Sequence, residues 1–237
     1  MDDKLDRFVE RVKSAAKENL KAVVLFGSSV SGEFHAKHSD LNLLCLVGTA
    51  NTGALEALRP EFSWWAKQKQ PVPLVFTLDE LRRSADIFAI ELIDIKARHR
   101  MLYGEDFWSG LTVPLSLHRH QIERELHTNW LRLRQRILTI PSGPLRLELM
   151  LASISTFTTL FRHTLIAIGE PAPERNREAI ERVAYLSGAD PGGFLEVLDI
   201  REEKKNGKTI DAEATLQRFL AFVEAVTNEV DQRFAEA

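Results

Sequence analysis

Two stretches near the N-terminus decide the fold: Val23-Val24-Leu25-Phe26-Gly27-Ser28-Ser29 and Ser39-Asp40-Leu41-Asn42-Leu43-Leu44. The first is an apolar run broken by glycine and serine, which predicts a buried strand that turns sharply into a helix. The unpaired N–H groups at such a helix start form an anion site. The second begins with an acid and stays apolar, which predicts another buried strand over 41–47. Because side chains alternate along a strand, we expect Asp40 and Asn42 to project from the same face.

A phosphate cradle beside paired oxygen ligands is the layout of a nucleotidyl-transfer centre. Gly27-Ser28, an interval of twelve residues and then Asp40-x-Asn42 resembles the signature of the DNA polymerase β-like nucleotidyltransferase superfamily. That signature is Gly-Ser, about ten residues, and then Asp-x-Asp/Glu. The chain is most similar to the small bacterial branch that includes the aminoglycoside nucleotidyltransferases. The resemblance spans roughly residues 15–110, and Leu102-Tyr103-Gly104-Glu105-Asp106 is similar to the end of that domain.

The resemblance implies a reaction that this sequence does not fully support. In the family, two acids hold Mg²⁺ against a nucleoside triphosphate, and a third acid on a later strand helps to activate the attacking hydroxyl. Only Asp40 matches, because Asn42 is neutral and its carbonyl oxygen is a weaker ligand for a hard cation. The strand expected over 71–77 carries no acid. We therefore expect at most a weak Mg²⁺ site at Asp40 and Asn42.

The residues proposed to bind a nucleotide are Gly27, Ser28 and Ser29, through backbone N–H groups and the Ser28 hydroxyl. A simple tight strand–helix turn is the alternative interpretation of the same residues. Asp40 could hold Mg²⁺ with Asn42 and water, or it could cap the loop through its own backbone. A different metal site at His35, His38 and Asp40 is a further alternative, although solvated loop histidines are the more common case.

Composition excludes several classes of protein. The chain has 237 residues, 44% hydrophobic and 27% charged, with a net charge of −3, which is typical of a globular protein and gives no strong nucleic-acid signal. Cys45 lies within an apolar strand, where a small buried residue is expected rather than a nucleophile. There is neither a signal-peptide pattern at the N-terminus nor an apolar run of membrane-spanning length, so we expect a cytoplasmic protein.

The first domain is expected over 1–112, as a mixed sheet flanked by helices. We expect a helix over 53–68 that Pro60 divides in two. Asp79 and Glu80 follow the strand expected over 71–77 and could replace the third acid. Thr77 and Glu80 have the spacing of a capping box, however, and we favour capping over catalysis. A helix is predicted over 84–98. It carries Glu91 and Asp94, which could replace the third acid only if this segment were extended.

The second domain is expected over 113–237 as an all-α bundle, which makes the chain α+β as a whole. Apolar stripes at helical spacing predict four to five antiparallel helices. Arg162 and His163 interrupt the most apolar helix, so their charge must be paired or must face a cleft.

Two functions remain open at this point. We favour a catalytically degenerate nucleotidyltransferase fold that keeps the triphosphate cradle and acts as a binding or interaction module. The alternative is an active Mg²⁺-dependent enzyme that moves a nucleoside monophosphate from a triphosphate to a hydroxyl of a small molecule, a protein or RNA. A homodimer is expected because the amphipathic helices need a partner for their apolar stripes.

Overall fold

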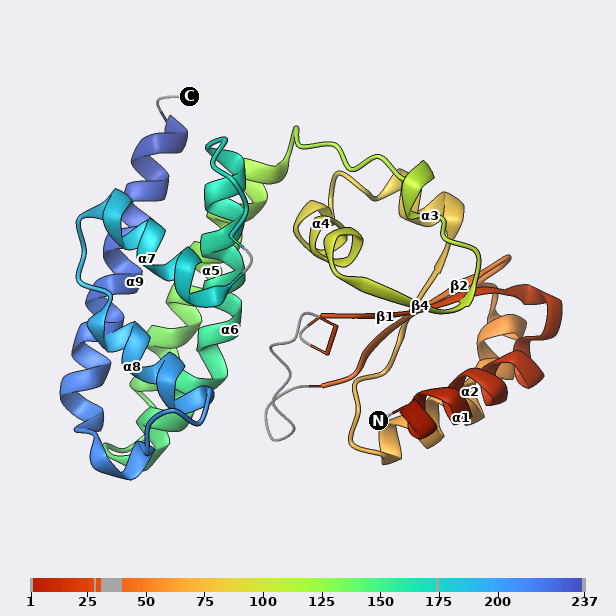
Figure 1. The fold of residues 1–237 in the computed structure, drawn as a ribbon, viewed down its shortest axis with the longest axis horizontal. Helices are drawn as coiled ribbons and strands as arrows, with labels where there is room; N and C mark the ends of the chain where they lie inside the picture. The colour runs from red at the N-terminus through yellow and green to blue at the C-terminus, as the bar shows by residue number, and fades with distance from the viewer. Residues whose placement is uncertain (1, 28, 31–39, 174, 236–237) are drawn as a thin grey trace. The chain divides into compact units, whose positions relative to one another are not determined.

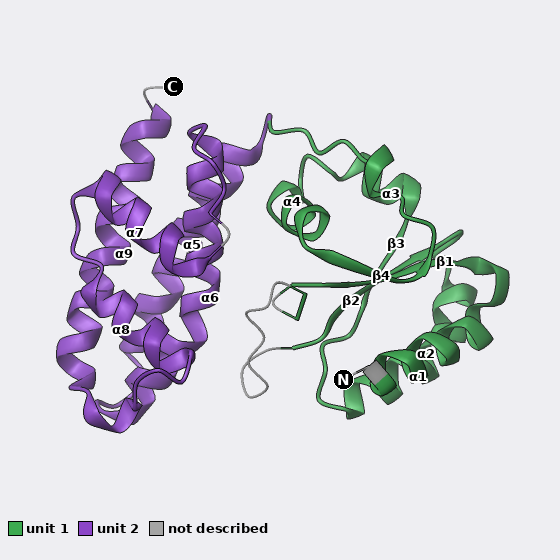
Figure 2. Ribbon diagram, viewed as in Figure 1, with its two compact units in different colours: residues 1–115 green, residues 116–237 purple. Residues whose placement is uncertain are grey.

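The computed structural model describes residues 2–27, 29–30, 40–173 and 175–235 (Figure 1). The chain divides into two compact units, residues 1–115 and 116–237 (Figure 2). The sequence placed this boundary at 112–113.

The first unit contains a four-stranded sheet with the strand order β3-β2-β1-β4. Strand β1 pairs antiparallel with β2 and β4, while β2 pairs parallel with β3. The sheet is therefore mixed, as predicted. The elements of this unit are α1 (Asp2–Ala16), η1 (Lys17–Asn19), β1 (Leu20–Phe26), β2 (Asn42–Val47), α2 (Thr52–Lys67), β3 (Leu74–Thr77), α3 (Leu78–Arg83), α4 (Ala89–Ala97), β4 (His99–Gly104) and η2 (Trp108–Gly110).

Helices cover both faces of this sheet (Figure 1). On one face, Val23, Leu43 and Cys45 pack with the apolar sides of α1 and α2, including Phe8 and Trp65. On the other face, the alternate strand residues pack with Leu81 of α3, Leu92 of α4 and Trp108. The central strands are buried on both faces, which explains why β1 and β2 are continuous apolar runs in the sequence.

Two expected helices have other bounds in the structure. Helix α2 continues through Pro60, so the predicted division of this helix was wrong. Proline removes one helical hydrogen bond, but Leu58 and Trp65 on either side are both buried in the core, and this packing holds the two halves in line. The helix expected over 84–98 is shorter, because α4 begins at Ala89.

The second unit consists of five α-helices and one short 3₁₀ helix in its described residues, which agrees with the predicted bundle. They are α5 (His118–Ile137), α6 (Pro144–Ala167), α7 (Asn176–Ser187), α8 (Gly192–Arg201), η3 (Gly207–Thr209) and α9 (Ala212–Ala235). Phe161, Phe194 and Phe222 form an aromatic centre with ring centroids between 5.4 and 5.7 Å apart. Among the helices that the structure describes, none has an apolar stretch long enough to cross a membrane.

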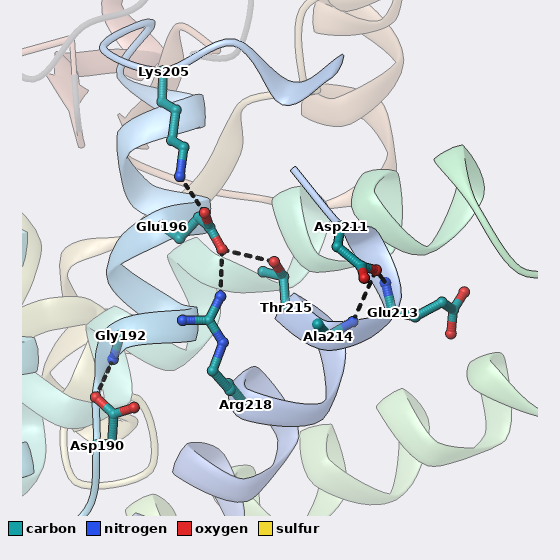
Figure 3. A network of polar contacts seen from close by, with 9 residues as sticks. All are labelled: Asp190, Gly192, Glu196, Lys205, Asp211, Glu213, Ala214, Thr215 and Arg218. Carbon is teal, nitrogen blue, oxygen red and sulfur yellow. Dashed lines mark hydrogen bonds and ion pairs between the residues drawn. The ribbon is translucent and has the colours of Figure 1, made fainter. Parts of the chain in front are cut away.

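Helices α8 and α9 approach each other closely. A Cβ atom on Gly193 would lie 2.6 Å from Cβ of Arg218 and 2.8 Å from the backbone N of Phe219, so only glycine fits there. The Glu196 carboxylate then binds across this junction to Arg218 (2.6 Å), Thr215 Oγ1 (2.7 Å) and Lys205 (Figure 3). Gly192 N, at the start of α8, donates to Asp190 Oδ1 at 2.8 Å.

Candidate functional site

The two parts of the sequence motif meet at one end of the sheet. Strand β1 ends at Phe26, β2 begins at Asn42, and these two residues are paired in the antiparallel register. Gly27 follows Phe26 directly, so the sheet brings Gly27 and Asn42 side by side. This confirms that the Gly-Ser stretch follows a buried strand and that the second stretch opens another.

Gly27 leaves space that the Asn42 side chain uses. A Cβ atom on Gly27 would lie 3.1 Å from Asn42 Nδ2, and the φ angle of Gly27 is +85°. A side chain at residue 27 would therefore be strained by the backbone conformation and crowded by the amide. Both effects favour glycine at this position.

Ser29 and Val30, the described residues directly after Gly27, lie in a turn, and the helix start expected here stays a prediction. Val30 N donates to Gly27 O at 3.0 Å, and the Ser29 hydroxyl donates to Phe26 O at 3.3 Å. The Ser29 hydroxyl hydrogen is thus used within the turn, although its oxygen can still accept. Ser28 and the histidines of the alternative metal site, His35 and His38, lie outside the described residues.

Asp40 and Asn42 have different surroundings. Asp40 is exposed and precedes the strand, whereas Asn42 is partly buried as the first residue of β2. The strand begins at Asn42, one residue later than expected, and the shared face of Asp40 and Asn42 stays a prediction. Gln70, which the sequence did not single out, fixes the approach to β2 because its Oε1 accepts from Leu41 N at 2.8 Å.

The third acid is not supplied by β3 or by the residues after it. Strand β3 is Leu74–Thr77 and contains no carboxylate. Thr77 and Glu80 form the predicted capping box, with Thr77 N donating to Glu80 Oε2 at 2.7 Å. Hydrogen bonds from the Thr77 backbone and side chain lower the pKa of Glu80. Thr77 pairs with Val47, at the other end of β2 from Asn42, and a six-residue strand is about 17 Å long at 3.3 Å per residue.

The acids of α4 do not meet the condition set for them either. Glu91 and Asp94 lie on a regular helix and not on an extended segment. Within the part of the chain that the structure describes, no group of three or more His, Cys, Asp or Glu residues could hold a metal ion. Asp40 and Asn42 together offer one carboxylate and one amide, so the donor set does not fit a site that needs two acids.

Sequence reasoning missed the basic residues at the start of β4. His99 pairs with Phe26 and Arg100 with Leu25, so Arg98, His99 and Arg100 lie at the same sheet end as Gly27. His99 Nδ1 donates to Ile95 O at 3.1 Å, which fixes the ring. The cluster of basic residues is visible in the sequence, but the antiparallel pairing of the first and last strands is not. Cationic side chains at this end suit an anionic ligand.

Cys45 takes no part in this site. Its side chain is fully buried in β2, and burial raises the pKa of the thiol to about 12. The thiolate, which is the reactive form, is therefore absent at neutral pH. The expectation of a small buried residue is confirmed.

No protein-family model and no curated protein sequence matches the chain. Among solved structures, it is similar to a spectinomycin adenyltransferase from Enterococcus faecialis, whose crystal structure contains ATP and spectinomycin. The TM-score is 0.59 at 16% sequence identity, over 95% of this chain and 98% of that one.

The chain has the nucleotidyltransferase fold. A second similarity, to a toxin–antitoxin structure with AMP-PNP, covers 43% of this chain and 74% of that one, at 18% identity and a TM-score of 0.30, which is too low to support an argument.

In this nucleotidyltransferase fold, the sheet end unites the Gly27 turn, Asn42 and the basic start of β4. Asp79 and Glu80 are at the opposite end.

Proposed function

We propose that the first unit is a nucleoside triphosphate-binding module in which nucleotidyl transfer is lost. The observation that carries this proposal is the contact between Gly27 and Asn42. Gly27 has no side chain of its own to cover the turn after β1, and Asn42 brings a neutral amide to the position where the family resemblance implies a carboxylate.

Binding is supported by the chemistry of this sheet end. Gly27 has no side chain to block approach to the backbone, and the start of β4 adds arginine side chains, which suit phosphate. We propose that the phosphates lie against Gly27, Ser28 and Ser29. The turn at residues 27–30 would then present backbone N–H groups, and the Ser28 hydroxyl would add one more donor.

Loss of turnover follows from the missing carboxylates. With one acid at residue 40, an amide at residue 42 and no acid on β3, the site lacks the charge needed to hold metal ions against phosphate and hydroxyl. A general base alone contributes roughly 10²–10⁴-fold to a rate. We therefore expect any Mg²⁺ bound by Asp40 and Asn42 to be held weakly.

Melting temperature in the presence of nucleotide tests the proposal. A ligand that binds only the folded state at one hundred times its Kd adds roughly 2.7 kcal/mol, which corresponds to a shift of several degrees. We expect a shift with millimolar triphosphate that Gly27→Val abolishes and Ser28→Ala reduces. Gly169→Val is the matched control, because Gly169 has a similar φ of +82° and open space around its Cβ position. The proposal fails if none of the four triphosphates produces a shift in the unsubstituted protein.

A second candidate is the active enzyme, which the likeness to an adenyltransferase over both units favours. That neighbour contains ATP and spectinomycin, so the substrates to try are ATP and an aminocyclitol. Transfer of labelled AMP to spectinomycin, another small hydroxyl compound, a protein or RNA, lost on Asp40→Ala, would establish this candidate instead.

We also propose that the chain forms a homodimer. Leu131 on α5 and Leu138, which directly follows this helix, are 54% and 85% exposed, and burying such residues against a second copy would be favourable. Sedimentation that finds only a monomer at tens of micromolar would contradict the dimer.

A further inference from the structure

The start of β2 offers a metal ion few ligands. Asn42 has an amide where the family resemblance implies a carboxylate, and the chain from 70 to 78, which leads into β3 and contains it, has no acid. The side-chain oxygen of Gln70 already accepts from Leu41 N at 2.8 Å. Asp40 is left as the one carboxylate of the motif. Because Mg²⁺ prefers carboxylate oxygens, this donor set does not fit the metal that the family resemblance implies.

A lysine lies at the rim of the same sheet end. Helix α2 is anchored by the buried Trp65, and Lys69 lies just beyond its last turn with a left-handed backbone, at a φ of +57°. Lys69 N donates to Ala66 O at 2.9 Å, which fixes this residue to the end of the helix. The next residue, Gln70, accepts from Leu41 N. Lys69 is therefore one residue away from a direct contact with the segment that opens β2.

Lys69 carries a positive charge that the fold has not used. The residue is exposed, and no carboxylate of the described residues forms an ion pair with its ammonium group. Arg98 and Arg100 also lie at this end of the sheet, but each of them interacts with another group of the chain. The charge that a ligand can meet here without breaking an existing contact is thus that of Lys69.

The charges at this sheet end determine which form of a triphosphate suits it. Mg²⁺ joins phosphates to a protein when carboxylates supply its other ligands, whereas an ammonium group contacts phosphate oxygens directly. In solution, Mg²⁺ also neutralises part of the negative charge of the triphosphate, so it weakens the attraction of this ligand to a lysine. A site with one carboxylate and an unused lysine should therefore favour the metal-free triphosphate.

We propose that the first unit binds a nucleoside triphosphate without a divalent cation, and that the Lys69 ammonium group contacts the phosphates in the role that the family resemblance gives to Mg²⁺. This inference rests on the proposed nucleotide binding and names the form of the ligand. Mg²⁺ in solution then competes with the protein for the phosphates instead of joining them to it.

Calorimetric titration of the full chain with each of the four triphosphates measures this preference. One series contains excess EDTA and the other contains millimolar Mg²⁺, at equal ionic strength because salt screens exposed charges. We expect the Kd in EDTA to be severalfold lower than the Kd in Mg²⁺. A Kd in Mg²⁺ equal to or lower than that in EDTA would overturn the inference and leave the proposed nucleotide binding intact. Absence of binding in both series would instead contradict the proposed function itself.

Matched lysine variants test the residue. Lys69→Gln removes the ammonium group and should raise the Kd in EDTA about threefold to tenfold, with a smaller change in Mg²⁺, while Lys69→Arg keeps the charge and should retain binding. Lys17→Gln is the control, because Lys17 is also exposed with a left-handed backbone (φ +52°) but precedes β1, at the opposite end of this strand from Gly27. Melting without nucleotide shows that each variant is folded. Equal Kd values in EDTA for Lys69→Gln and Lys17→Gln would contradict the role given to Lys69.

Discussion

Asn42 Nδ2 lies 3.1 Å from the position that a Cβ atom on Gly27 would occupy. The register pair Phe26–Asn42 creates this approach, since it aligns the end of β1 with the start of β2. The glycine of the motif is therefore favoured by its neighbour on the next strand as well as by its own backbone conformation.

The first prediction separates these two requirements. Gly27→Ala should destabilise the first unit by about 1–2 kcal/mol through the positive φ angle alone, with an added cost from the crowded amide. Gly169→Ala has a similar φ and no neighbouring atom within 4 Å, so it should show only the backbone cost. Urea unfolding of both variants measures the difference. If Asn42→Ala in the Gly27→Ala background restores no stability, the crowding argument is wrong.

Asn42→Asp should increase Mg²⁺ affinity without restoring turnover. The change adds the second carboxylate beside Gly27, and a hard cation prefers carboxylate oxygens. β3 still carries no acid, so no base is added. Calorimetry with Mg²⁺ and triphosphate should detect tighter binding, while labelled-nucleotide transfer stays at background. Substantial transfer by this variant alone would contradict the prediction, because it would mean that another group of the chain already serves as the base.

Thr77→Ala should cost stability without affecting nucleotide binding. The Thr77 hydroxyl accepts from Glu80 N at 3.2 Å, and loss of such a cap costs about 1 kcal/mol. Because the cap lies at the far end of β2 from Asn42, the nucleotide-dependent melting shift should stay the same. A variant that loses the shift while it remains folded would place the site elsewhere on the sheet.

Glu196 should make the second unit sensitive to strong acid. Burial acts to raise the pKa of Glu196, but hydrogen bonds from Lys205 and Thr215, with the nearby Lys205 and Arg218 charges, lower it overall. A lowered pKa in the folded state gives stability that is present above the unfolded value of about 4.3 and is lost as pH falls through the folded value. Glu196→Gln should therefore cost about 1 kcal/mol at pH 7, and this cost should shrink between pH 5 and 3. Glu178, on the exposed face of α7, is the control. An equal cost of Glu196→Gln at pH 5 and pH 3 would contradict this account, and so would a similar pH-dependent cost of Glu178→Gln.

Much of the fold could be predicted from local patterns. The buried strands, the capping box at Thr77 and the helical stripes of the second unit are all signals that lie within a few residues of one another. These local patterns mislead where tertiary packing outweighs propensity. Pro60, for example, stays inside α2 because Leu58 and Trp65 on either side of it are buried in the core.

The candidate site could be predicted only in part. Gly27 and Asn42 were identified by motif, and the strand register places them together. The Arg98–Arg100 segment was not identified because it reaches the site through the pairing of β4 with β1, and Gln70 because it does so through a hydrogen bond from Leu41 N, 29 residues away in the sequence.

The helical unit shows the same limit. His118 Nε2 lies 2.8 Å from His163 Nδ1, and this contact was missed because helix spacing predicts which face is buried but not which residue of another helix it meets.

The pairing of Phe26 with Asn42 has a consequence for how this site could vary among proteins of the same fold. The ladder holds the two motif halves together, so their separation in space does not depend on the length of chain that joins them. Adding a few residues between 28 and 41 would change the entropy of closing that connection by only about 0.2 kcal/mol. Insertions and deletions there should leave Gly27 and Asn42 in place. The number of residues between the two halves of the motif can therefore differ among proteins of this fold.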